Sequence, residues 1–100
     1  MTAKVYIFIA EQFNVSRCES SLRCERKFDT EAEAMDYFNA YDIANEFRIY
    51  TNTEGLHSME DATIVATVTK ASIDEDGWVE CDSMDEIASK EYSWADYIEA

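Results

Sequence analysis

Residues 4–11, KVYIFIAE, are the stretch around which the rest of the chain is organised. Apolar side chains fill both alternating sets of positions, with Val5 and Ile7 on one set and Tyr6 and Phe8 on the other. A strand with one solvent-exposed face would instead alternate apolar and polar residues. The stretch therefore predicts an interior strand whose two faces are both covered, or nearly so.

A second strand is predicted at residues 20–28, after a polar loop at residues 12–19. Leu22, Cys24 and Phe28 occupy alternating positions of the strand and so point to one side. This pattern predicts one buried face and one solvent-exposed face. Charged residues fill the other parity: Arg23, Glu25 and Lys27.

The next element is predicted to be a helix from Glu31 to Asn45. Thr30 followed by Glu33 is a capping-box pattern, and the segment is rich in helix-forming residues. Its length corresponds to about four turns. An apolar stripe runs along it at helical spacing: Ala34, Met35, Phe38 and Tyr41.

Two further strands are predicted at residues 46–52 and 62–71, which are rich in β-branched and aromatic residues. The Glu54-Gly55 region between them is typical of a turn. We therefore expect these two strands to pair in antiparallel fashion.

The last part of the chain predicts a turn at Asp76-Gly77, a short strand-like piece at residues 78–81, and a helix to Glu99. Ser83 followed by Glu86 forms a second capping box. The buried stripe expected for this helix is Met84, Ile87, Ala88, Trp94, Ala95 and Ile98.

The expected order is thus ββαββ(β)α in one α+β domain spanning residues 1–100. We expect an antiparallel sheet of four to five strands with two helices on one face, in two layers. The chain has 100 residues, of which 47% are hydrophobic and 13% aromatic, enough to build a core. The composition therefore excludes a disordered acidic tail.

Charge is the most unusual property of the chain, which carries a formal net charge of -14. From residue 51 onward there are 13 acids against Lys70 and Lys90, whereas the first fifty residues carry 9 acids and 6 bases. A field of this sign repels nucleic acid and anionic membranes and attracts surfaces that bind them. We therefore expect no direct binding to nucleic acid or membrane.

The acidic residues of the last quarter, with one tryptophan, are the candidate partner-binding residues. They could serve recognition of a basic partner or solubility alone. The acids of the predicted helix alone have a lower charge density than duplex DNA. The segment that precedes the helix would have to lie beside it to match that density. The candidates are Asp74, Glu75, Asp76, Trp78, Glu80, Asp82, Asp85, Glu86, Asp96 and Glu99.

Cys18, Cys24 and Cys81 have no Cys-x-x-Cys spacing, and His57 is the one histidine. A zinc site is therefore not expected. Cys24 is expected to be a small buried residue and Cys18 a more exposed thiol, and a disulfide between them stays open as the less favoured alternative.

The apolar run of residues 5–10 is too short for a signal-peptide core or a membrane span, which indicates a cytoplasmic protein.

Residues 74–80 resemble a calcium loop, with Asp74, Asp76 and Glu80 at ligand positions. The first and twelfth positions would be Ser72 and Ser83, so the leading aspartate and the bidentate glutamate are missing. The sequence therefore favours a hairpin turn, and we expect no metal and no cofactor.

His57 is followed by Ser58, Glu60 and Asp61 without a nucleophile elbow or an oxyanion loop, which favours an exposed loop histidine and predicts no catalytic residues.

The first hairpin holds the main basic cluster, for which pairing with Glu19 and Glu25 is expected. This cluster is Arg17, Arg23, Arg26 and Lys27.

The acidic run Asp74-Glu75-Asp76, Glu80, Asp82 and Asp85-Glu86 on a small folded body resembles the phage-encoded inhibitors of bacterial defence, the anti-CRISPR and anti-restriction proteins, several of which imitate DNA charge. The resemblance implies a non-enzymatic protein that blocks a basic nucleic-acid-binding protein or ribonucleoprotein complex in the bacterial cytoplasm.

Two other functions are open. The chain could be a small α+β interaction or assembly module, a homodimer included, that works through a sheet face or an edge strand. An enzyme that uses His57 or a pair of acids would need a deep pocket.

Overall fold

The computed structural model describes the backbone of residues 3–99 and the side chains of this range except those of residues 3 and 81–83. Within this part the fold is α+β, with a four-stranded antiparallel sheet in the order β2-β1-β3-β4. The antiparallel α+β class expected from the sequence is confirmed. The strands are β1 (Ala3–Asn14), β2 (Glu19–Phe28), β3 (Ala62–Ile73) and β4 (Val79–Ser93).

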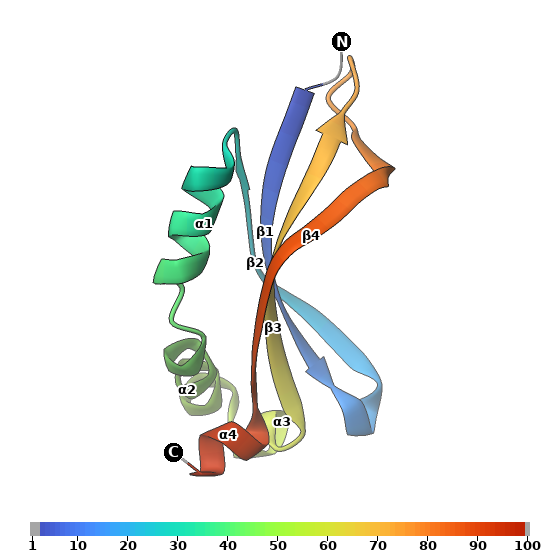
Figure 1. The fold of residues 1–100 in the computed structure, drawn as a ribbon. Coiled ribbons are helices and arrows are strands. Elements are labelled where there is room, and N and C mark those ends of the chain that lie inside the picture. The colour runs from blue at the N-terminus through green and yellow to red at the C-terminus, as the bar shows by residue number, and fades with distance from the viewer. Residues whose placement is uncertain (1–2, 100) are drawn as a thin grey trace.

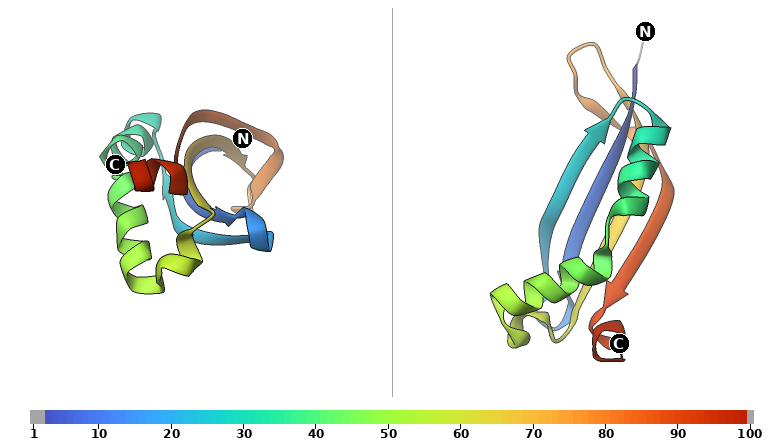
Figure 2. Two further views of the ribbon diagram at one scale, coloured as in Figure 1. Left: turned by 90° about the horizontal axis from the view of Figure 1, so that it is seen from below. Right: turned by 90° about the vertical axis from the view of Figure 1, so that its left-hand side faces the viewer.

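The helices α1 and α2 lie on the same side of this strongly twisted sheet (Figure 1). The molecule is elongated, with extents of 48 × 27 × 19 Å, and α2, α3 and α4 gather at one end of the long axis (Figures 1 and 2). The helical elements are η1 (Val15–Arg17, a 3-10 turn), α1 (Glu31–Ala40), α2 (Ile43–Glu54), α3 (Leu56–Met59) and α4 (Trp94–Glu99).

Strand β1 is an interior strand, as its sequence predicts, and pairs with β2 on one edge and β3 on the other. Phe8 is fully buried and packs with Phe38 of α1. On the opposite face, Val5 and Ile7 form a second buried cluster with Ala71. Both faces of β1 are therefore covered.

The predicted strand at residues 20–28 is confirmed as β2, but a bulge changes its facing pattern. The register with β1 shifts between Ala10 and Glu11, where Arg23 has no directly opposite residue. Cys24 and Phe28 pack against the core beneath α1, whereas Leu22 pairs with Glu11 and is 59% exposed. The bulge thus moves Leu22 out of the predicted covered face.

The first capping box is confirmed at the start of α1. The Thr30 side chain accepts a hydrogen bond from the Glu33 amide at 3.2 Å and donates one to the Glu33 carboxylate at 3.0 Å. The helix is shorter than expected, because Tyr41 is extended and α1 ends at Ala40.

The predicted strand at residues 46–52 is wrong, because this segment belongs to helix α2. The Asp42 side chain caps the helix by accepting a hydrogen bond from the Asn45 amide at 3.1 Å. Phe47 and Thr51, one helical turn apart, are the buried residues of α2. Burial at this spacing outweighs the β-propensity of the segment. The expected pairing of residues 46–52 with residues 62–71 is therefore also wrong.

The predicted helix from Ser83 to Glu99 is wrong for most of its length, because β4 continues to Ser93 and α4 has 6 residues. Strand β3 has buried residues along its whole length, and its second edge needs a hydrogen-bonding partner. Strand β4 supplies that partner. The predicted strand-like piece at residues 78–81 is the beginning of β4, and the predicted strand at residues 62–71 is confirmed as β3.

Candidate functional site

The turn between β3 and β4 is built around the side chain of Asp74. One carboxylate oxygen of Asp74 accepts hydrogen bonds from the amides of Asp76 at 3.0 Å and Trp78 at 2.9 Å. Gly77 supplies the positive φ of +87° that the predicted Asp76-Gly77 turn requires. Asp74 is therefore occupied in shaping the turn.

We call the exposed candidates at this end of the molecule the acidic hairpin. Its members are Glu75, Asp76, Trp78, Glu80, Asp85 and Glu86, all with exposed side chains. Trp78 is the apolar member of this set, with 73% of its surface accessible. The sequence places no lysine or arginine between residues 74 and 86. The side chain of Asp82 lies outside the described residues.

Asp96 and Glu99 do not join the acidic hairpin. They belong to α4, at the opposite end of the long axis (Figure 1). The strand from Glu86 to Ser93 alone separates them by about 23 Å, at about 3.3 Å per residue. Asp96 also has a local role, because its carboxylate accepts hydrogen bonds from the Ser93 amide at 2.9 Å and the Ser93 hydroxyl at 3.1 Å.

Lys90, the one base between residues 74 and 99, is occupied inside the protein. Its ammonium group donates hydrogen bonds to the carbonyl oxygens of Phe38 at 2.6 Å and Tyr41 at 2.7 Å. It also lies 4.6 Å from the centre of the Phe38 ring. Burial lowers the pKa of Lys90. Lys90 thus binds the C-terminal carbonyls of α1 instead of neutralising the exposed acids.

The expected internal pairing of the basic first hairpin is confirmed for Arg17 alone, since Arg23 binds a different partner and Arg26 donates to the Glu25 backbone carbonyl at 2.8 Å. Arg17 lies 3.7 Å from the Glu19 carboxylate. Arg23 binds both oxygens of Glu54 at 2.6 Å and lies 4.2 Å from the centre of the Tyr50 ring. The bulge in β2 directs Arg23 to α2, so its partner is Glu54 and not Glu25.

A buried polar network joins the end of β1 to α3, and the sequence did not predict it. The Gln12 side chain donates to Asn14 at 2.7 Å, and the Asn14 amide donates to the Ser58 carbonyl at 2.7 Å. Hydrogen bonds to Asp61 from Ser16, and from Asn14, lower the pKa of the Asp61 carboxyl. The polar residues at 12 and 14 in an apolar strand were the signal for this network.

Cys18 and Cys24 are free thiols, so the alternative disulfide between them is absent. Cys18 is exposed, as expected, and Cys24 is half-buried. His57 is exposed in α3, with its Nδ1 atom 3.6 Å from Glu60. Among the side chains that the structure describes, no group of three or more His, Cys, Asp or Glu residues is placed to hold a metal ion.

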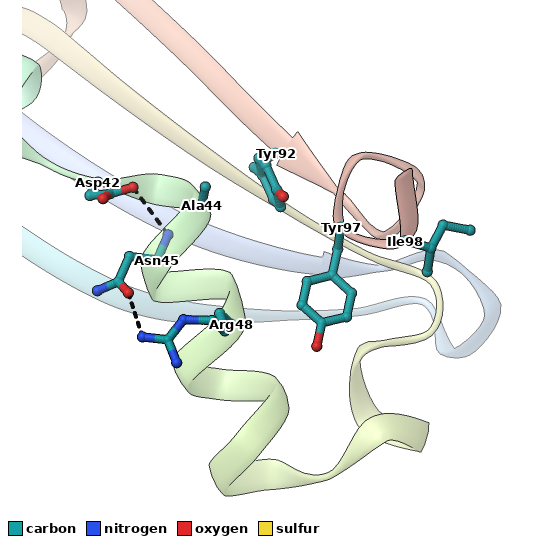
Figure 3. Close-up of a pocket in the computed structure, with 7 residues that line it drawn as sticks. All are labelled: Asp42, Ala44, Asn45, Arg48, Tyr92, Tyr97 and Ile98. Atoms are coloured by element: carbon teal, nitrogen blue, oxygen red, sulfur yellow. Dashed lines mark hydrogen bonds between the residues drawn. The ribbon is translucent and has the colours of Figure 1, made fainter. Parts of the chain in front are cut away.

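Neither His57 nor a residue of the acidic hairpin lines any of three surface cavities formed by the described residues. The largest of these three, of about 640 Å³, lies between α2 and α4 (Figure 3). A cavity of about 420 Å³ adjoins η1, and one of about 270 Å³ adjoins the junction of α1 and α2.

Comparison with protein-family models, with curated proteins and with solved structures finds no match to this chain. No helix among residues 3–99 is long and apolar enough to cross a membrane.

Proposed function

We propose that this chain is a non-enzymatic inhibitor that uses its acidic hairpin to bind the basic, nucleic-acid-binding surface of a bacterial defence complex in the cytoplasm. The observation that carries the proposal is the exposure of the acidic hairpin around Trp78, in a segment without a base. Lysine and arginine side chains that normally hold phosphates would pair with these carboxylates.

The spacing of the acids favours a hairpin that enters a basic groove over a surface that copies a duplex. Between Glu80 and Glu86 the strand carries about one acid per 5 Å, from its rise of about 3.3 Å per residue. Duplex DNA carries about one charge per 1.7 Å of axis. The acidic hairpin would thus pair with a few neighbouring lysine and arginine side chains, and not with a long row of them.

Trp78 would anchor the complex. Tryptophan is enriched among the residues that dominate binding energy at protein interfaces. Met84 and Ile87, at 42% and 36% exposure, add apolar surface along the same strand. An apolar anchor within a charged surface gives affinity that persists after the charges have steered the encounter.

The test is affinity capture from bacterial lysate with immobilised protein, comparing two double charge reversals. Glu75→Lys with Asp76→Lys alters the acidic hairpin and leaves Asp74 to hold the turn. Asp36→Lys with Glu60→Lys makes the same change in net charge at exposed positions of α1 and after α3. The hairpin variant should lose a nucleic-acid-binding partner that the control variant retains.

Equal capture by both variants would contradict the proposal, because net charge alone would then explain binding. Circular dichroism of both variants must match the wild type, so that a lost partner reports the surface and not the fold.

The second candidate function is an assembly module, favoured by the outer edges of β2 and β4, which pair with no further strand among residues 3–99. Leu22 is exposed on β2, and Met84 and Ile87 are exposed on β4. Edge strands of this kind can pair with another chain, a second copy included. Self-association that is indifferent to salt would favour this function over the inhibitor.

A further inference from the structure

A surface cavity forms a groove between α2 and the last part of the chain. Its volume of about 640 Å³ lies in the range of small-molecule sites. Two walls face each other across it (Figure 3). Asp42, Ala44, Asn45 and Arg48 line one side, and Tyr92, Tyr97 and Ile98 line the other.

The first wall is a row of polar side chains along α2. Asp42 is the N-cap residue of α2, and Asn45 and Arg48 follow it at intervals of three residues, so successive members are neighbours. The Arg48 guanidinium donates to the Asn45 side-chain oxygen at 2.7 Å, and Figure 3 shows this contact. A single amide contact leaves most donors of the guanidinium unused.

Among the described residues, Arg48 and Arg26 have no carboxylate within ion-pair distance, whereas Arg17 and Arg23 each have one. Of Arg26 and Arg48, it is Arg48 that lines the groove. Its planar fork fits the two oxygens of a carboxylate.

The second wall is apolar and held in place from beneath. The rings of Tyr92 and Tyr97 each lie 5.4 Å from the buried ring of Phe47. Ile98 is 61% exposed and extends this wall. Aromatic rings fixed in this way give a planar ligand a surface to stack on.

We propose that this groove binds a small organic carboxylate, with a planar apolar body on Tyr92, Tyr97 and Ile98 and its carboxylate on Arg48. The net charge of -14 and the nearby Asp42 penalise each additional negative charge on a ligand. A monoanionic carboxylate is therefore favoured over a phosphate. The groove is far from the acidic hairpin (Figure 1), so this inference is independent of the proposed function.

Trp94 gives the experiment an internal reporter, because its ring lies 5.4 Å from that of Tyr97. In a Trp78→Phe background, Trp94 is the remaining tryptophan. The probe is phenylbutyrate, titrated against Trp94 fluorescence and against amide chemical shifts. Phenylbutanol, which lacks the charge, and phenyl phosphate, which carries more of it, are the comparison ligands.

The expected result is saturable binding of phenylbutyrate with shifts confined to α2, α4 and the end of β4. Arg48→Gln should weaken binding roughly tenfold or more, equivalent to about 1.4 kcal/mol. Arg26→Gln, the same change at an exposed residue of β2, should leave affinity unchanged. Phenylbutanol and phenyl phosphate should both bind more weakly.

Three results would overturn the proposal: no saturable change with phenylbutyrate, equal affinity of Arg48→Gln and Arg26→Gln, or binding of phenylbutanol as tight as that of phenylbutyrate. Arg48 is exposed and in no ion pair within the described part of the chain, so its replacement should leave the fold intact. Ile98→Ala gives a second check, since it should weaken all three ligands through the apolar wall.

Discussion

The ammonium group of Lys90 donates a hydrogen bond to the carbonyl oxygen of Phe38 at 2.6 Å, and this contact joins residues 52 positions apart in the sequence. Lys90 comes from β4 and Phe38 from the last turn of α1, where helix carbonyls lack partners within the helix. The contact fixes α1 to the edge of the sheet and occupies the one base within residues 74–99, whereas Lys70 of β3 lies opposite Asp85.

Lys90→Met should destabilise the protein by about 1–3 kcal/mol, because the change removes donors to the carbonyls of Phe38 and Tyr41. Methionine keeps an unbranched apolar stem against the Phe38 ring. Urea denaturation measures the loss. Lys27→Met, at an exposed position of β2, is the matched control and should change stability by less than about 0.5 kcal/mol. Equal effects of the two variants would exclude the capping role.

Tyr41→Phe should leave stability unchanged or raise it by up to about 1 kcal/mol. The Tyr41 hydroxyl is buried without a hydrogen-bond partner among the described residues. Its removal relieves a desolvated polar group and keeps the ring 5.0 Å from that of Phe8. A loss above about 1 kcal/mol in urea denaturation would show that the hydroxyl has a partner, such as water.

The stability difference between the wild type and Tyr41→Phe should depend on pH. Burial, with the neighbouring Tyr50, raises the pKa of Tyr41 above its ordinary value of 10.0. Above about that pH the unfolded chain releases this proton while the folded protein keeps it, so stability falls as pH rises. Urea denaturation across this range should show the wild type losing stability faster than Tyr41→Phe, and parallel curves would contradict the assignment.

Asp74→Ala should cost about 0.5–2 kcal/mol, as the loss of a capping side chain does, because it removes the acceptor for the amides of Asp76 and Trp78. Asp74→Asn keeps a side-chain oxygen and should restore most of the loss. Asp76→Ala, whose side chain is exposed in the same turn, is the control. If all three variants are equally stable in thermal denaturation, the Asp74 side chain does not hold the turn.

Residues 4–11 predicted the interior strand correctly, because apolar residues on both parities occur where a strand is covered on both faces. Residues 62–71 predicted β3 correctly through their β-branched residues. Thr30 and Glu33 predicted the start of α1 for a local reason, since a capping box depends on neighbours alone.

The errors lie where short-range pattern and tertiary context disagree. Phe47, Ile49 and Tyr50 resemble strand residues, but burial of Phe47 and Thr51 one turn apart makes the segment a helix. Met84, Ile87 and Ala88 are spaced as a helical stripe, yet Ile87 lies at a bulge and Ala88 pairs with Val68 of β3. The need of β3 for a partner is not visible in residues 79–93 themselves.

The candidate site was predicted in part. The acids and Trp78 around the Asp76-Gly77 turn do lie together at one end of the molecule, because a hairpin keeps neighbours in sequence close in space. Asp96 and Glu99 were expected on one helix with Asp85 and Glu86, and the extended β4 separates the two pairs. Arg48 and its groove could not be predicted, because they depend on how α4 packs beside α2.

The most direct test of the proposed function is competition for the partner that the immobilised protein captures from bacterial lysate. The captured complex is challenged with DNA or guide RNA, and in parallel with a salt gradient. Binding through the acidic hairpin predicts that nucleic acid displaces the protein and that affinity falls as salt screens the charges. A partner that nucleic acid does not displace, and whose affinity is indifferent to salt, would contradict the account.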